Sequence, residues 1–528
     1  NGENSSCVLA NRSGFMAVRA KTVIDATDRA LVGRMTSAKF EDFVPGEYMF
    51  ERIVATRGTP PEPWSGWVTE LSPGIKTPAE RLDLLSGWVT ELSPGIKTNE
   101  NEYPAYQYTL PLRLEAPGLL ATQAAEIEAR LQTWDPGQIM ASERLFSIPE
   151  DRLDNGCRQS NVFDGKGLCT DALRCADERV WLLSLCADLT QEGARQLSEP
   201  GPLTKAGWQL GKEVAAHADG VALSKDVRAV PPNEAVSDVD VRREDKYFRL
   251  ADVSSIPLEL NRFPVVSGTD VLVVGGGTAG APAAIAAGRS GVDTLLLENL
   301  YMLGGVGTAG RIANYHHGNR CGFTLEVDQG VDEMGPGTGF ENGRWNTAWK
   351  QQWFLQEAHK AGARVCFGTT AIGAVCCNGD MAGVLAASPT GTGIVRTDAV
   401  IDATGNADVA AAAGAPVVNI DNSHVAVQGT GLPPIIPEQD YTNTDYTFVD
   451  DTDIEDVTRA FATAREKFKD AFDLGQIVDS RQRRQIKGDI TLGPLDFYTS
   501  RTFPDTVVTS KSNFDSHGYT IHPLFFAK

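Results

Sequence analysis

The stretch that decides the fold runs from Thr269 to Glu298 and reads TDVLVVGGGTAGAPAAIAAGRSGVDTLLLE. Its apolar run VLVV at 271–274 is typical of a central parallel strand that is covered on both faces. Glycines with GxGxxG spacing follow, then an Ala-rich segment and a second apolar strand, DTLLLE. The order strand, glycine turn, helix, strand predicts a βαβ unit that binds a dinucleotide.

Each glycine of this motif has a physical role in such a unit. Gly275 permits a tight turn, Gly277 lets the backbone approach a pyrophosphate, and Gly280 lets helix and strand pack closely. The helix N-terminus offers N–H groups and the positive end of its dipole to the diphosphate. The alternative is a glycine turn that only serves packing. The predicted cofactor contacts are Gly275, Gly276, Gly277, Thr278, Ala279 and Gly280.

The second strand ends in an acidic residue, Glu298, which lies 18 residues after Gly280. A carboxylate at this position can accept hydrogen bonds from an adenosine ribose. Its negative charge would repel a 2′-phosphate, which disfavours NADP. These residues alone leave FAD and NAD open.

Composition limits the partners of the chain. Its 528 residues carry 48 Lys and Arg against 69 Asp and Glu, a formal charge of −21. Hydrophobic residues make up 42% and charged residues 22%, the balance of a globular protein. The acidic excess argues against broad binding to nucleic acid or anionic lipid and favours a small-molecule partner. The oligomeric state stays open.

The N-terminal residues and the length of the apolar stretches bear on where in the cell the protein is found. No stretch reaches the roughly 18 apolar residues of a membrane helix. The first residues, NGENSSCVLANRSG, lack an apolar signal segment and do not begin with Met. We therefore expect a cytoplasmic protein whose natural N-terminus is missing from this sequence.

Two internal repeats divide the chain. SGWVTELSPGIKT occurs identically at 65–77 and 86–98, which suggests a recent duplication or an assembly error without a function. A diverged repeat relates 8–38 to 384–415, and each copy reads as a β-hairpin, a VIDAT strand and a helix. The two VIDAT strands start at Val23 and Val400, 377 residues apart, so one type of half-domain is used twice.

A second glycine-rich stretch, NLYMLGGVGTAGRI at 299–312, follows Glu298 where a plain NAD domain would enter its next helix. With VIDATGNADVAAAAGA at 400–415, it resembles the bacterial FAD-dependent oxidoreductases of the glutathione-reductase-like flavoprotein fold. The resemblance covers 269–528 well and 1–218 more weakly. Further similar segments are YHHGNRCGFTLEVD at 315–328, WKQQWFLQEAHKAGARVCFGT at 349–369, SRQRRQIKGDITL at 480–492 and RTFPDT at 501–506.

The resemblance implies FAD as the cofactor and assigns residues to it. The first glycine loop and Glu298 would hold the ADP half. A loop of Gly304, Gly305 and Gly307 would run beside the flavin or the ribityl chain. Thr404 and Gly405 would also approach the cofactor, and Asp188 could bond the ribityl chain. The first repeat has Asp28 in place of Gly405, which puts cofactor approach there in doubt.

Candidates for proton handling and substrate binding are fewer. His316 or His317 could serve as an acid or base near the flavin, with a structural or surface histidine as the alternative. Arg484, in a cluster with Arg481 and Arg483, could orient an acidic substrate, although bonding to local carboxylates is the more common role of such a cluster. Nine cysteines without a CxxC motif, and a histidine pair without a third ligand, give no metal site.

The resulting prediction is an α/β flavoprotein with a Rossmann-like FAD-binding domain, a mostly parallel sheet, a β-meander near 371–398 and a mixed substrate or cap region. We expect it to be an FAD-dependent oxidoreductase acting on a small organic substrate. The alternatives are a degenerate scaffold and an NAD-binding dehydrogenase. We also predict that 179–218 supplies the closing strand and helix of 263–528. The predicted parts are the tail of a first module (1–218), a linker (219–262), the FAD-binding domain (263–415) and a partial cap (416–528).

Overall fold

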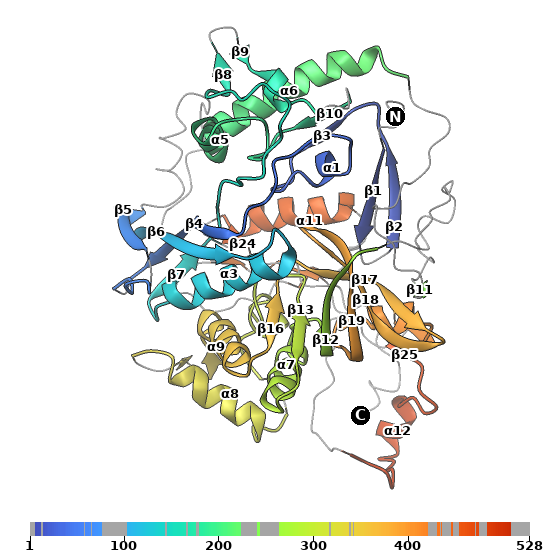
Figure 1. Ribbon diagram of the computed structural model, residues 1–528. Helices are drawn as coiled ribbons and strands as arrows, with labels where there is room; N and C mark the ends of the chain where they lie inside the picture. Colours follow the sequence, from blue (N-terminus) through green and yellow to red (C-terminus); the bar gives the residue numbers. More distant parts are fainter. Residues whose placement is uncertain are drawn as a thin grey trace.

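The fold is described from a computed structural model (Figure 1). The residues that it describes are 6–75 (without 12–13, 58 and 65), 103–222 (without 143–144, 165–166 and 176–178), 240–242, 263–420 (without 316–317, 337–338 and 342), 430–432, 434–435, 445–446, 454–469, 471, 473–474 and 483–507. The second identical repeat, 86–98, lies outside these residues.

The largest element is a seven-stranded sheet in the second half of the chain. Its four neighbouring strands β19, β12, β13 and β16 are parallel, and β17 and β18 extend the sheet beyond β19 as an antiparallel meander. The mostly parallel sheet and the β-meander are therefore confirmed. In spatial order the strands are β11 (Asp240–Arg242), β17 (Thr370–Cys377), β18 (Asp380–Ser388), β19 (Gly391–Asp402), β12 (Val265–Val274), β13 (Thr294–Leu297) and β16 (Arg364–Cys366).

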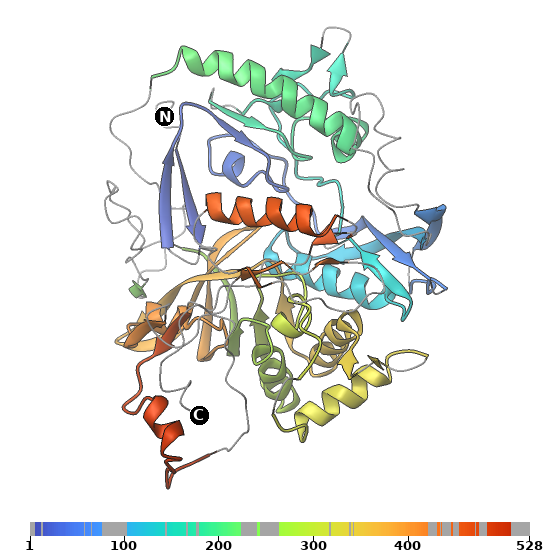
Figure 2. The ribbon, with the colours of Figure 1, turned by 180° about the vertical axis from the view of Figure 1, so that it is seen from behind.

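The apolar run of β12 supplies both faces of this sheet. Val273 packs on one face with residues of the three helices α7 (Gly280–Arg289), α8 (Phe323–Asp332) and α9 (Thr347–Lys360), whereas Leu272 and Val274 pack on the opposite face. Successive side chains of a strand point to opposite faces, so burial of both produces a continuous apolar sequence. In Figures 1 and 2 the three helices lie on the lower side of the sheet and the first half of the chain on the upper side.

The first half contains a second, antiparallel sheet in the order β5 (Trp67–Ile75), β6 (Tyr103–Leu114), β4 (Gly46–Thr56) and β7 (Gln138–Ala141). Helix α3 (Leu119–Thr133) packs on this sheet through Ala125 and Ala129. This part of the first half is thus a regular antiparallel sheet with a helix packed on it.

The structure confirms the diverged repeat, because the hairpins of the two copies pair corresponding residues. The hairpin of β1 (Ser6–Asn11) and β2 (Gly14–Arg19) pairs Ser6 with Arg19, and the hairpin of β18 and β19 pairs Gly383 with Arg396. Each of these positions differs from its counterpart by 377 residues, the spacing of the two VIDAT strands. A short helix follows each strand, α1 (Leu31–Arg34) and α10 (Asp408–Ala412).

The prediction that 179–218 supplies the closing strand of 263–528 is wrong, because this strand pairs with the first half of the chain. Residues Val180–Leu182 do form a buried strand, β10, but it pairs in parallel with β3 (Val23–Asp25) of the first half. The helices α5 (Gln191–Ser198) and α6 (Pro200–Asp219) follow it. Because β3 is the first copy of the VIDAT strand and lies nearer in sequence, the closing strand stays with its own module.

Helix α3 joins the two halves. The side chain of Gln123 accepts a hydrogen bond from the backbone N–H of Phe367 at 2.9 Å, and the Nε1 of Trp349 donates to the carbonyl of Pro136 at 2.9 Å. Ile127 of α3 lies in the same apolar cluster as Phe367. The first half of the chain therefore packs directly on the sheet of the second half.

Short elements complete the described residues. Part of the predicted linker forms β11, which pairs with β17. In both ribbon views α11 (Ile454–Lys467) lies between the first half and the large sheet. The remaining elements are α4 (Thr170–Leu173), α12 (Pro494–Tyr498) and the paired strands β8 (Phe163–Asp164) with β9 (Gly167–Leu168), β14 (Phe340–Glu341) with β15 (Arg344–Trp345), β20 (Val417–Ile420) with β25 (Arg483–Ile486), β21 (Thr430–Gly431) with β23 (Asp445–Tyr446), and β22 (Pro434–Ile435) with β24 (Asp473–Leu474).

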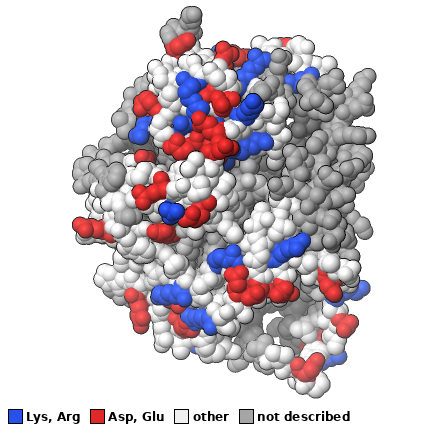
Figure 3. Space-filling model, in the orientation of Figure 1, with Lys and Arg blue, Asp and Glu red and all other residues white. Residues whose placement is uncertain are grey.

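Surface charge and hydropathy add two observations. On the face drawn in Figure 3, acidic side chains gather over the upper part of the molecule, with small groups of basic side chains beside them. Among the described residues, no helix combines the length and the apolar character needed to span a lipid bilayer.

Candidate functional site

The first glycine loop connects β12 to α7 at the carboxyl edge of the sheet. Gly275 has a φ of +96°, and a Cβ on it would lie 2.4 Å from the carbonyl oxygen of Ala403. A Cβ on Gly280, the first residue of α7, would lie 1.7 Å from the carbonyl oxygen of Gly275. Backbone atoms cannot move aside as a side chain can, so only glycine fits these two positions.

Gly277 differs from Gly275 and Gly280, because a side chain at this position would point into open space. The nearest non-neighbouring atom to a Cβ on Gly277 is the Cα of Gly305, at 4.0 Å. Thr278 and Ala279 are exposed, and α7 begins without a side-chain cap. An uncapped helix N-terminus beside a bare backbone is the arrangement that receives a diphosphate. The cradle of the first loop therefore fits the group that the sequence predicts.

The second glycine stretch packs against the first. Gly304 donates its N–H to the carbonyl of Gly276 at 2.9 Å, and the turn η2 (Gly305–Gly307) follows. A Cβ on Gly305 would lie 2.9 Å from the Cα of Gly277, and Gly304 has a φ of +99°. Close backbone contact without intervening side chains therefore joins the two loops.

Glu298 follows β13 and holds the first loop in place. It is 8% exposed, and its Oε2 accepts the N–H of Gly276 at 2.6 Å while its Oε1 accepts the N–H of Leu300 at 2.6 Å. Each carboxylate oxygen has two lone pairs, so a ribose hydroxyl could still donate to it. The structure thus assigns Glu298 a bracing role, and its ribose contact stays a prediction.

The end of β19 forms a third loop at the same edge. Asp402 accepts hydrogen bonds from the hydroxyl and the N–H of Thr404, at 2.7 and 3.1 Å, through one oxygen. Its other oxygen accepts the N–H groups of Val409 and Ala410 at 3.0 and 2.9 Å. Gly405 turns with a φ of +72°. The carboxylate caps α10 and fixes Thr404 and Gly405 beside the Gly275 turn.

The first copy builds the same turn in the first half. Asp25 accepts from the hydroxyl and the N–H of Thr27 at 2.7 and 2.9 Å, and from the N–H of Gly33 at 2.8 Å. The residue before each short helix, Ala30 or Ala407, has a left-handed backbone with φ of 52° or 51°. The adjacent strand is β10, so no glycine loop meets this turn among the described residues of the first half.

Of the other predicted site residues, Arg484 contacts the third loop, where its Nε donates to the carbonyl of Asn406 at 3.1 Å. No contact found among the described residues brings Asp188 to the three loops. Asp188 is buried in the first half, where it accepts the N–H of Cys157 at 2.8 Å and pairs with Arg158 at 3.0 Å. Arg484 pairs with the carboxylate of Asp408 at the start of α10, which is the local role that the sequence left as its alternative. His316 and His317 lie outside the described residues.

Sequence reasoning missed a buried lysine behind the second glycine turn. Lys350 on α9 places its Nζ 3.4 Å from the ring centroid of Trp345 and 3.5 Å from the hydroxyl of Tyr315. Burial lowers its pKa to about 8. The available signal was the spacing on α9, because Trp353 and Phe354 follow Lys350 at i+3 and i+4 and place it on the apolar face of the helix.

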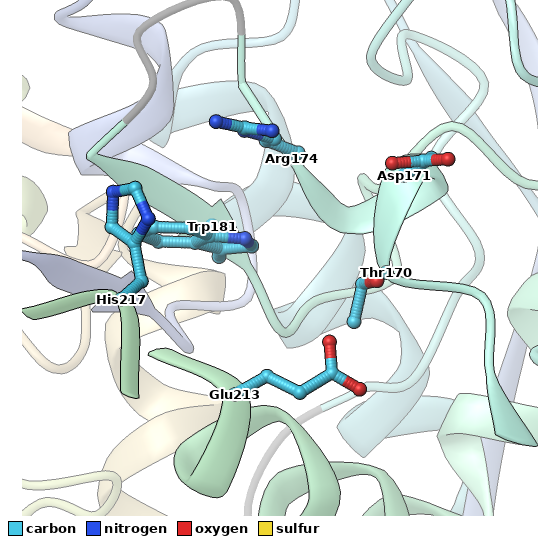
Figure 4. Close-up of a pocket in the computed structure, with 6 residues that line it drawn as sticks. All are labelled: Thr170, Asp171, Arg174, Trp181, Glu213 and His217. Carbon is cyan, nitrogen blue, oxygen red and sulfur yellow. The ribbon is translucent and has the colours of Figure 1, made fainter. Parts of the chain in front are cut away.

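A separate cavity of about 200 Å³ lies in the first half (Figure 4). The ring of Trp181 on β10 stands edge-on to that of His217 on α6, with centroids 5.2 Å apart, and the guanidinium of Arg174 lies 5.9 Å from the Trp181 centroid. Thr170, Asp171 and Glu213 complete the lining. Its elements are those of the first module, so it is distinct from the glycine loops.

Three loops that converge at the carboxyl edge of a mostly parallel sheet define an α/β dinucleotide-binding protein. Residues 270–474 match the model of a family described as FAD dependent oxidoreductase. This part of the chain is thus similar to FAD-dependent oxidoreductases, and the match indicates FAD as its cofactor. The match supports the FAD prediction over the NAD alternative for this segment. Among curated proteins, no match was found.

Solved structures were also compared. The protein THI4 of Thermovibrio ammonificans is 22% identical, over 28% of this chain and 61% of its own, with a TM-score of 0.21. A geranylgeranyl bacteriochlorophyll reductase-like protein of Thermoplasma acidophilum is 24% identical, over 34% and 49%, with a TM-score of 0.25. This chain therefore spans about half to three-fifths of the length of these two proteins.

Proposed function

We propose that residues 263–415 hold FAD with its diphosphate over the Gly275–Gly280 loop, and that the protein transfers hydride between the flavin and a small organic substrate. The observation that carries this proposal is the open backbone of Gly277 where two glycine loops meet. A packing turn would fill that space with a side chain. Here both loops expose bare backbone beside an uncapped helix N-terminus.

The chain itself would bind and position the cofactor, which supplies the two-electron chemistry when bound. The first N–H groups of α7 would donate to the diphosphate, and the helix dipole favours its negative charge. Glu298 holds the Gly276 amide and would accept a ribose hydroxyl. The Gly304–Gly307 turn would lie along the flavin or ribityl end.

We also propose that the first half carries no second FAD and acts as a scaffold and cap. Asp28 replaces the glycine of the second copy, which adds a side chain and a charge where the cofactor would approach. The strand beside its VIDAT copy is β10, which carries no glycine loop. One FAD per chain is therefore the expected stoichiometry.

Replacing Gly277 with valine tests the cofactor site. The φ of Gly277 is not in the left-handed region and the space beside it is open, so the variant should fold. It should bind FAD at least about tenfold more weakly, a loss of about 1.4 kcal/mol, because the side chain occupies the diphosphate position. The measurement is FAD content per chain and titration of the apoprotein followed by flavin fluorescence.

Gly268→Val is the matched control, because Gly268 lies on β12, the strand that leads into the loop, and a Cβ there meets no atom within 4 Å. It should bind FAD like the unmodified chain. Folded protein that takes up no FAD, or equal binding by both variants, would contradict the assignment. Anaerobic screening of small organic reductants for bleaching of the flavin absorbance then identifies the substrate class.

A further inference from the structure

Lys350 is a buried cation that the proposed function does not use. Only 7% of the residue is exposed, although it is a lysine. Its ammonium stacks on Trp345 and reaches the hydroxyl of Tyr315 at the limit of hydrogen-bond distance, 3.5 Å. Burial of an ammonium is costly unless other groups compensate for the lost water, so its retention here needs a reason.

The nearby carboxylate is engaged elsewhere. Asp328 on α8 pairs with the guanidinium of Arg320 at 2.5 Å and accepts the hydroxyl hydrogen of Tyr315 at 3.2 Å. Arg320 also lies 5.5 Å from the ring centroid of Tyr315. One acidic and two basic side chains therefore meet around Tyr315, which leaves a net positive charge in this group.

This group contacts the back of the second glycine turn. The indole Nε1 of Trp345 donates to the carbonyl of Gly307 at 2.7 Å. A Cβ on Gly307 would lie 3.4 Å from the Trp345 ring and 3.8 Å from the Nζ of Lys350. Two residues earlier, Gly305 touches Gly277 of the first loop. One three-residue turn thus links the buried cation to the cofactor loop.

We propose that Lys350 is a positioning residue which places a positive charge behind the Gly305–Gly307 turn and stabilises negative charge on the flavin end of bound FAD. The inference rests on the proposed function, since it needs that turn to lie along the flavin. The aromatic face of Trp345 holds the ammonium in place without neutralising it. The charge of Lys350 can therefore act across the turn in a medium of low dielectric constant.

The first test is the redox equilibrium of the bound flavin, measured against a reference dye at pH 7. Reduced flavin carries more negative charge than oxidised flavin, so Lys350→Met should lower the ratio of reduced to oxidised FAD. We expect about a tenfold change at fixed potential, which is about 30 mV for a two-electron couple. Lys350→Arg keeps the charge and should stay closer to the unmodified protein.

Lys360→Met is the matched control, because Lys360 lies on the same helix, is exposed and pairs with Glu357. It should leave the ratio unchanged. An unchanged ratio in Lys350→Met, or the same shift in Lys360→Met, would overturn the inference.

A second test needs no FAD. In apoprotein labelled with ¹⁵N-tryptophan, the indole resonance of Trp345, assigned with Trp345→Phe, should titrate with a midpoint near pH 8. The groups that face Lys350 are Tyr315, Arg320 and Asp328, and Lys350→Met should abolish the titration if Lys350 is its source. If the folded chain binds no FAD, the proposed function is wrong. If the Trp345 resonance of the unmodified chain shows no titration near pH 8, the ammonium of Lys350 does not lie beside Trp345 and the inference is overturned.

Discussion

The chain builds the same acidic turn twice and surrounds it differently. In the first half Asp25 holds Thr27 and the start of α1, and in the second half Asp402 holds Thr404 and the start of α10. The accepting and donating atoms correspond, and the paired residues are 377 positions apart. A short run of sequence is therefore sufficient to specify the turn.

The neighbours of the turn differ. The first turn is covered by β10, so Asp25 is only 2% exposed, whereas Asp402 is half-buried. The second turn lies beside β12, whose end carries the glycine loop. The comparison teaches that the shared turn organises a helix start, while the strand next to it decides whether a cofactor loop is present.

Removal of the turn carboxylate, Asp25 or Asp402, should change the free energy of unfolding more than the other substitutions below. Equal losses at the two positions would contradict the difference between the two turns. Asp25→Ala leaves buried backbone donors without an acceptor and should cost about 3 kcal/mol of unfolding free energy. Asp402→Ala should cost about 2 kcal/mol or less, because water can reach that turn. Urea unfolding of both variants measures the difference, and Asp→Asn at each site serves as the milder control. A larger loss at Asp402 would contradict the role of burial.

Exchange of the residue that distinguishes the two turns should have an intermediate effect. Gly405 has a φ of +72°, so Gly405→Asp adds strain and a negative charge beside the proposed diphosphate site. We expect FAD affinity to fall about tenfold, or about 1.4 kcal/mol. Asp28→Gly should leave the FAD content at one per chain, as judged by absorbance after extraction. A second bound FAD in that variant would show that the turn, and not the adjacent strand, is decisive.

The smallest effect concerns the packing of β10. A Cβ on Gly33 would lie 2.5 Å from the Cδ2 of Leu182, whereas the second copy has Ala410 at the same position. Gly33→Ala gains up to about 1 kcal/mol in helix propensity but must displace Leu182. We expect net destabilisation of about 0.5 kcal/mol in thermal unfolding. Stabilisation by Gly33→Ala would indicate that Leu182 of β10 does not pack closely against α1 in solution. Gly211→Ala is the control, because a Cβ at this position of α6 meets no atom within 4 Å, and it should stabilise the protein.

Local patterns of sequence predicted the parts that depend on short stretches. The glycine motif and Glu298 give the loop after β12, and the repeated VIDAT strands give two hairpins in the same register. In each case neighbouring residues specify the conformation through turn sterics, apolar periodicity or a capping carboxylate.

Contacts between distant segments were not predictable in the same way. Nothing in the sequence of β10 tells whether it pairs with Val23 or with Val400, because both copies carry the same VIDAT strand. The spacing of Trp353 and Phe354 places Lys350 on the apolar face of α9, but it does not indicate that the ammonium lies over the ring of Trp345. The sequence did not indicate that Asp188 pairs with Arg158, and it gave the bonding of Arg484 to a local carboxylate without naming Asp408, since ion pairs depend on tertiary placement.

The contact of Gln123 with Phe367 has a consequence for solubility. Strand β16 is the last strand of the large sheet, and Phe367 directly follows it. An open sheet edge is a template for aggregation, and proteins often shield such edges with a helix. The carboxamide of Gln123 meets both the N–H and the carbonyl of Phe367, at 2.9 and 3.4 Å, much as a further strand would. Helix α3 thereby occupies hydrogen-bonding groups at this border of the sheet that another strand would otherwise use.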